Sequence, residues 1–197
     1  MSGAYPVTPE FSAINFKSIH RNVSSESRSG RLQVRSLGLQ RWSFTAKYRG
    51  LTKAQVRSIY AFIERQRGML DTFTIQLPDI GIPAGTATLN GTVKANGAAT
   101  AGSNTVTLDG VGAGDTFIAG DFIKWANHSK VYMIVADSTG NGAVVIEPPL
   151  VADVPNNTVA DNYNLSFTVR MSNDIQQFKA SGGDLYGIEI DMLEELV

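Results

Sequence analysis

The chain has 197 residues, of which 43% are hydrophobic and 18% charged, with a net charge of −1 and no cysteine. This composition is typical of a folded globular protein and argues against a largely disordered chain or a membrane protein. The lack of cysteine excludes disulfides, thiol catalysis and thiolate metal sites. With neither a signal peptide nor an apolar run near the ~20 residues of a membrane span, we expect the chain to stay in the cytoplasm in which it is made until it joins something larger.

The charges are distributed unevenly along the chain. Residues 1–70 contain twelve Lys and Arg and three acids, a balance of +9, so the other 127 residues carry −10. Such asymmetry is typical either of nucleic-acid binding by the basic half or of basic and acidic surfaces that meet between subunits. The basic residues are dispersed and not clustered with stacking aromatics, which favours contacts between subunits.

The first forty residues predict an irregular segment followed by β structure. Pro6 and Pro9 prevent regular structure in residues 1–10. The Ser-rich residues 23–30, VSSESRSG, predict an exposed turn, and a change of hydrophobic phase near Gly38 predicts a bulge in the strand that follows. The expected first anchors to a core are Phe11, Ile14, Phe16 and Ile19.

Residues 41–77 predict a strand, a helix and a second strand. Apolar and polar residues alternate in residues 41–48 and 72–77, as in half-buried strands, and Pro78 ends the second one. A sheet with one helix laid across it is the expected result.

The helix has its own start and stop signals. Thr52 and Gln55 form a capping-box pattern at its beginning, and Gly68 is its expected end. Its apolar stripe consists of Val56, Ile59, Tyr60 and Ile63.

A Gly-rich region then predicts a small barrel. Residues 81–145 hold eleven of the nineteen glycines and show no helical periodicity. Short strands joined by tight turns are typical of a partly open barrel such as the OB-fold. The five expected strands are residues 88–94, 105–108, 122–125, 131–135 and 143–146.

Two further strands close the chain. Residues 165–171 alternate like the strands before Pro78, and a last strand, residues 188–192, follows the turn at 182–183. The economical interpretation is a mainly β (α+β) fold. Residues 1–82 and 163–197 would form a belt-type sheet domain with one packed helix, and residues 83–162 an inserted OB-fold-like barrel.

A search for catalytic and ligand-binding patterns is mostly negative. His20 and His128 lie in different expected domains without a partner at metal-ligand spacing, and the GVGAG stretch at 110–114 precedes no helix that could bind a phosphate. The Gly-Asp steps at Asp115 and Asp121 are more typical of turns than of a calcium or acid-base site. We therefore predict no catalytic, cofactor or metal site, and no enzyme.

Six stretches resemble, in their order and spacing, the distal tail protein (Dit) family of long-tailed bacteriophages, especially the compact form of T5-like siphophages. They are TPEFSAINFKS (8–18), SFTAKY (43–48), IYAF (59–62), LDTFTIQLP (70–78), AGDFIKWANHSKVYMI (119–134) and LYGIEIDML (185–193). The resemblance covers nearly the whole chain, although none of its stretches is a chemical signature.

The resemblance implies a structural virion protein at the tail tip. The first domain would form a homohexameric ring, with the OB-fold domain projecting outwards. The ring would join the tail tube protein to the tip or hub protein, contact outer collar or fibre proteins, and leave a lumen through which DNA passes. It implies no catalytic residue, cofactor or membrane binding, and the chain has no room for a carbohydrate-binding insertion.

A closed ring needs two different complementary surfaces on each subunit. We predict that they include the basic residues Arg35, Arg41 and Lys47 of one subunit and the acids Glu189 and Asp191 of the next. Two alternatives stay open. One is another tail ring component, a tube subunit or terminator; the other is a carbohydrate- or nucleic-acid-binding module that stacks its ligand on Trp125 and Tyr132 at the barrel surface.

Overall fold

A computed structural model of the protein describes residues 3–78, 80–87, 92–181 and 185–196. With 47% of residues in strands and 7% helical, the fold is mainly β, as the alternating patterns predicted. The chain divides into two compact units, Met1–Phe73 with Val169–Glu194, here called the sheet unit, and Thr74–Thr168 with Glu195–Val197, here called the barrel unit. From the sequence, the first domain was expected to end at residue 82 and to resume at residue 163.

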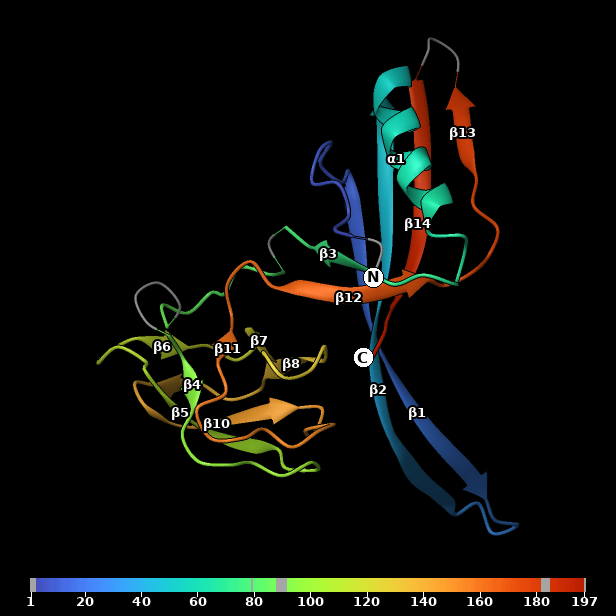
Figure 1. The fold of residues 1–197 in the computed structure, drawn as a ribbon. Coiled ribbons are helices and arrows are strands. Elements are labelled where there is room, and N and C mark those ends of the chain that lie inside the picture. The colour runs from blue at the N-terminus through green and yellow to red at the C-terminus, as the bar shows by residue number, and fades with distance from the viewer. Residues whose placement is uncertain (1–2, 79, 88–91, 182–184, 197) are drawn as a thin grey trace. The chain divides into compact units, whose positions relative to one another are not determined.

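The first sheet is antiparallel in all the pairings described. Its order is β1 (Ala13–Glu26), β2 (Leu32–Leu51), β14 (Leu185–Glu194), β12 (Ser166–Met171) and β3 (Phe73–Gln76), and β13 (Phe178–Ser181) also pairs with β14. Strand β14 therefore has β2 on one side, and on the other side β13 at its beginning and β12 at its end (Figure 1). Strand β13 was not predicted from the sequence.

The helix α1 (Lys53–Arg65) begins as its capping box predicts. The side chain of Thr52 accepts the backbone N–H of Gln55, and the Gln55 side chain accepts the backbone N–H of Thr52 at 2.9 Å. The helix ends at Arg65, before the expected stop, because the chain enters the left-handed region at Arg67 and again at Gly68. Among the described residues, no helix is long and apolar enough to cross a membrane.

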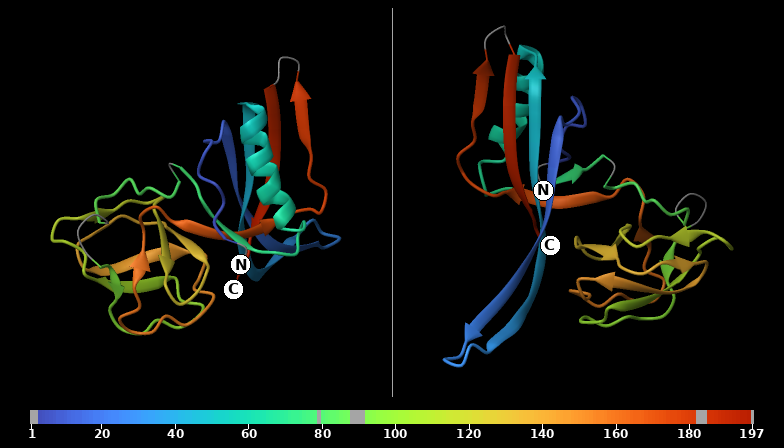
Figure 2. Two further views of the ribbon diagram at one scale, coloured as in Figure 1. Left: turned by 45° about the horizontal axis from the view of Figure 1, so that its top comes forward. Right: turned by 180° about the vertical axis from the view of Figure 1, so that it is seen from behind.

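The core of the sheet unit lies between α1 and one face of β2 and β14 (Figure 2). Alternate strand residues point toward the helix, and burying each large side chain contributes about 1.5–3 kcal/mol. The buried residues include Phe44, Ala46, Tyr48, Val56, Ile59, Ile63, Ile190 and Met192. The predicted helix stripe is thus confirmed for Val56, Ile59 and Ile63.

The N-terminal segment is anchored by Tyr5, which the sequence did not single out. Its side chain is only 4% exposed and lies against the rings of Phe11, Phe62 and Phe73. The hydroxyl of Tyr48 donates a hydrogen bond of 3.2 Å to the Tyr5 hydroxyl. Burial raises the pKa of Tyr48 to about 12 and that of Tyr5 further.

Half of the expected turn at residues 23–30 is strand. Strand β1 continues to Glu26 and β2 begins at Leu32, so the turn is confined to the residues between them. Ile19, expected to be a core anchor, is 42% exposed because β1 and β2 run on together beyond the core. The register of this pair shifts between His20 and Asn22, opposite Gly38 with its φ of +72°, where a bulge was expected.

The barrel unit contains a second sheet, which curls into a nearly closed barrel. Its order is β11 (Ala160–Asp161), β7 (Phe122–Trp125), β8 (Val131–Ile134), β10 (Gly142–Glu147), β5 (Thr105–Asp109) and β4 (Lys94–Ala95), beside the separate pair β6 (Thr116–Phe117) and β9 (Ser138–Thr139). Four of the five predicted strands are confirmed. The fifth, residues 88–94, falls partly on residues 88–91, which lie outside the described residues, and only its last residue belongs to a strand, β4.

Candidate subunit interface

Among the described residues, the first sheet has three outer strands, β1, β3 and β13, of which β1 and β13 lie wholly in the sheet unit. In the described residues, β1 pairs only with β2, and β13 pairs only with β14. Strand β1 is 14 residues long and β13 only four. Because an outer strand presents backbone N–H and C=O groups to a partner, these edges are two unlike sites for strand addition.

The strand directions make the two edges compatible with each other. The order β1, β2, β14, β13 is antiparallel at every step. With an even number of strands, the outer edges run in opposite directions, so β13 of one copy can join β1 of the next as an ordinary antiparallel pair. A repeated junction of this kind is heterologous and closes into a ring when the rotation between copies fits.

The face of this sheet opposite α1 is polar and carries two side-chain pairs within the chain. Lys47 Nζ lies 2.8 Å from Glu189 Oε1, and the Thr45 hydroxyl donates to Asp191 Oδ1 at 2.7 Å. Both pairs follow from the antiparallel register of β2 and β14, which places these residues directly opposite each other. Glu189 and Asp191 thus each have a partner in their own chain, and their expected contact with cations of the next subunit stays a prediction.

The other predicted interface residues lie elsewhere on the sheet. Arg41 is half-buried in β2, opposite Ile19 of β1, and Arg35 is exposed on the outer part of β2, opposite Val23. The structure thus brings Lys47 and Glu189 together within one chain, whereas Arg35 and Arg41 lie opposite residues of β1.

A groove of about 370 Å³ lies on the polar face beside β13. Its walls are parts of β2, β13 and β14 together with residues 173–177, and Ile175 in that segment is 83% exposed. The hydrogen bond from Lys47 lowers the pKa of the Glu189 carboxyl, and the nearby charges of Lys179 and Arg49 add to this effect. The groove is lined by three cations, Lys47, Arg49 and Lys179, and two acids, Glu189 and Asp191.

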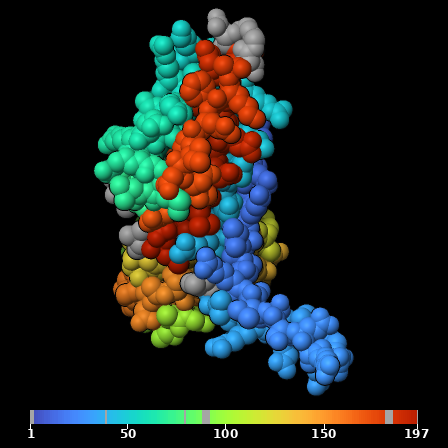
Figure 3. All heavy atoms as spheres, turned by 90° about the vertical axis from the view of Figure 1, so that its right-hand side faces the viewer, coloured from blue at the N-terminus to red at the C-terminus, as the bar shows by residue number. Residues whose placement is uncertain are grey.

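The outer parts of β1 and β2 form a projecting ribbon, residues 21–37, here called the hairpin arm (Figure 3). All of its residues are exposed. Its turn is closed by backbone hydrogen bonds between Ser27 and Arg31 and between Gly30 and Ser27. This ribbon was not predicted, because strands that cover no core need no apolar alternation on one face.

Trp125 and Tyr132 cannot form the expected stacking surface on the barrel. Both side chains are fully buried in the barrel core. The Tyr132 hydroxyl accepts the backbone N–H of Val151 at 3.0 Å and lies 2.8 Å from His128 Nε2. Since His128 Nδ1 faces the side-chain oxygen of Asn127 at 3.0 Å, the proton belongs on Nδ1, and Nε2 accepts from Tyr132.

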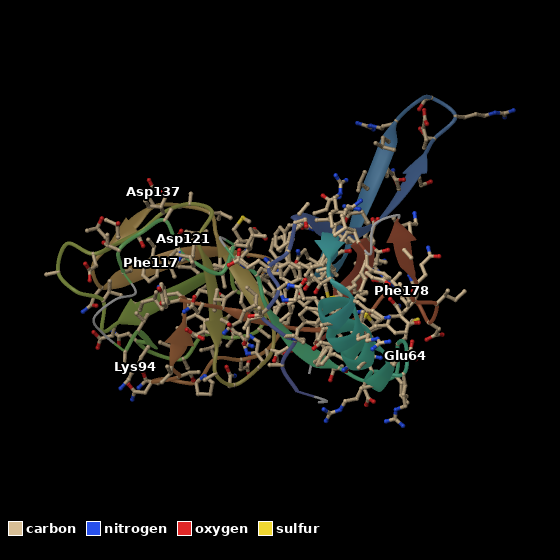
Figure 4. All side chains as sticks on the ribbon, turned by 90° about the horizontal axis from the view of Figure 1, so that it is seen from above. Glu64, Lys94, Phe117, Asp121, Asp137 and Phe178 are labelled. Carbon is tan, nitrogen blue, oxygen red and sulfur yellow. The ribbon has the colours of Figure 1, made fainter. Side chains whose placement is uncertain are left out.

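Asp121 acts as a backbone anchor inside the barrel unit (Figure 4). Its buried carboxylate accepts the backbone N–H groups of Ala84, Gly85 and Ile118 at 2.7, 3.1 and 2.9 Å. These three donors are all backbone groups. Within the described residues, no group of three or more His, Asp or Glu side chains is arranged to hold a metal ion.

Comparisons with known proteins add no family: no protein-family model and no curated protein matches this sequence.

Proposed function

We propose that this chain is a structural subunit of a bacteriophage tail, forming a ring at the distal end of the tail tube. The ring joins the tube to the tip or hub protein and leaves a lumen for DNA. The subunits associate through the edges of their sheets, β13 of one copy against β1 of the next.

The observation that carries this proposal is that two outer strands of the sheet, β1 and β13, are unlike in length and run in opposite directions. Exposed sheet edges favour association with another chain, and natural proteins usually cover or interrupt them. A heterologous edge pairing uses both strands in every copy and leaves neither open in a closed ring. The resemblance of the sequence to distal tail proteins supports the same assembly.

Charges contribute little to the affinity of this assembly. The Lys47–Glu189 pair lies within one chain and is exposed, and pairs of this kind add little to stability. Backbone pairing between edges, together with apolar contacts at the junction, supplies the affinity in this proposal.

The alternative of a sugar- or base-binding module is weaker, because Trp125 and Tyr132, its proposed stacking residues, are buried.

A tube subunit or terminator would also form a ring, and the size of the final assembly distinguishes a tube subunit from a distal ring. Tube subunits polymerise into long filaments, whereas a distal ring stops at a single closed assembly.

Light scattering coupled to size exclusion, followed by negative-stain imaging, tests the proposal. A hexamer of the 21.2 kDa chain has a mass of 6 × 21.2, or about 127 kDa. We expect that mass and six-fold rings with an open lumen. Filaments would favour a tube subunit, and a monomer that binds glycans would contradict the ring.

A further inference from the structure

The hairpin arm is a surface that the described chain leaves uncovered. An isolated two-stranded ribbon is only marginally stable in water, and a projecting surface rich in apolar side chains is typical of an interaction site. The arm and its base carry five aliphatic side chains that are 42–62% exposed: Ile19, Val23, Leu32, Val34 and Leu37. Their number indicates that another molecule covers the arm.

The arm combines these apolar side chains with positive charge. Leu32 and Val34 share one face of the ribbon, since they pair with Glu26 and Ser24 and alternate residues point the same way. Four arginines and one glutamate give the arm a balance of +3: Arg21, Glu26, Arg28, Arg31 and Arg35. The surface that fits it is apolar at its centre and acidic at its margin.

The barrel unit carries a surface with these properties on the outward face of β8 and β10. Val135 donates its backbone N–H to Val145, so these two exposed valines lie side by side. Glu147 is exposed on the same face of β10, two residues beyond Val145, and accepts a hydrogen bond from Asn104 at 2.7 Å. Asp137 is exposed in the segment that follows β8 and accepts the backbone N–H of Ala119 at 2.8 Å. We call Val135, Val145, Glu147 and Asp137 the barrel patch.

The barrel patch differs in charge from the other candidate surfaces of this chain. The polar face of the sheet carries three cations, Lys47, Arg49 and Lys179, against two acids, Glu189 and Asp191, so its balance of +1 offers the basic arm no net attraction. The sheet unit has fourteen Lys and Arg against nine acids, a balance of +5, whereas the barrel unit has three against nine, a balance of −6. On the barrel, Lys94 lies opposite Asp109 on β5, and Figure 4 shows it at the other margin of the unit from Asp137.

From these features we infer that the hairpin arm of one copy docks onto the barrel patch of a second copy. Leu32 and Val34 cover Val135 and Val145, and the arginines of the arm approach Glu147 and Asp137. Nucleic acid is the competing partner for an arginine-rich ribbon, but it offers no apolar surface for exposed Leu and Val side chains.

Site-specific cross-linking tests this contact in the full-length protein. The chain has no native cysteine, so single cysteines can be introduced without background. Val34→Cys and Val145→Cys proteins are mixed and treated with a short bismaleimide, which can join the two only between copies.

Val159→Cys is the matched control on the barrel, since Val159 is 41% exposed against 37% for Val145. Val7→Cys is the control outside the arm.

We expect the Val34–Val145 heterodimer to form several-fold more than the Val34–Val159 or Val7–Val145 products. Arg31→Glu with Arg35→Glu should reduce its yield several-fold, and adding Glu147→Lys and Asp137→Lys to the barrel partner should restore it. Equal yields at Val145 and Val159 would overturn the inference. The inference would also be overturned if no cross-link formed and the protein shifted the mobility of duplex DNA at physiological salt. That shift would then be lost in the Arg31→Glu and Arg35→Glu variant.

This inference rests on the proposed self-association of the chain, but the two can fail separately. A closed ring without the Val34–Val145 product would retain the proposed function and remove the arm contact. The specific product in a protein that forms no ring would retain the arm contact and remove the proposed function.

Discussion

Lys47 and Glu189 form an ion pair of 2.8 Å between neighbouring strands of one chain, and their backbones are directly opposite in the β2/β14 register. The pair therefore reports how β14 aligns on β2. It also places a cation and an anion where the sequence suggested a contact between subunits.

We expect Lys47→Glu to lower the thermal stability of the protein, because two carboxylates would then face each other across the strands. Adding Glu189→Lys should restore it. Differential scanning calorimetry at low salt and at about 1 M salt, where the Debye length is only about 3 Å, checks the cause. A loss of stability that salt does not reduce would show that the effect is not electrostatic.

Thr52→Ala should cost about 1 kcal/mol of the free energy of unfolding, because the helix loses the side-chain half of its capping box. Ser58→Ala in the exposed middle of the same helix is the control, since alanine favours a helix interior. Denaturation followed by Trp42 fluorescence in a Trp125→Phe background reports the sheet unit. Equal stabilities of the two variants would contradict the role of Thr52.

The two tryptophans lie in different units, so Trp125 can report the barrel unit in a Trp42→Phe background. In that background we expect Asp121→Asn to cost about 1–3 kcal/mol, because the buried carboxylate accepts three backbone N–H groups. Asp137→Asn is the matched control, because Asp137 is exposed and accepts the backbone N–H of Ala119. If the control lost as much stability, burial and the number of donors would not be the reason.

The barrel unit should also lose stability in mild acid. Burial lowers the pKa of His128, and the charge of Lys124 lowers it further. The folded state therefore binds a proton less readily than the unfolded state, whose histidine has a pKa of about 6.5, so the stabilisation is complete above that pH and is lost as the pH falls through the folded pKa. Denaturation between about pH 7 and pH 5 should show this slope, and His128→Gln should flatten it. An unchanged slope in the variant would assign the acid sensitivity to other groups.

Much of the local structure could be predicted because it depends on short-range patterns. Alternation identified the strand around Phe44, and the Thr52–Gln55 pattern identified the start of the helix. The partner of each strand could not be predicted, since pairing joins residues far apart in the sequence. For that reason the Lys47–Glu189 pair was assigned to two subunits and not to one.

Burial in the barrel was harder to predict for a different reason. Strand β7 buries Phe122, Ile123 and Trp125, so both of its faces are covered and alternation cannot separate inside from outside. The hairpin arm was not predicted because its strands bury neither face, and because the Ser-rich sequence resembled a turn.

Hydrogen exchange of the assembled and the dissociated protein tests the central claim, that the sheet continues from one copy to the next. Mass spectrometry would compare amides in residues 13–20 of β1 and 178–181 of β13 above and below the concentration at which the assembly dissociates. We predict that outward-facing amides of both strands exchange rapidly in the monomer and slowly in the assembly. An assembly that forms while both edges exchange as fast as in the monomer would contradict the claim.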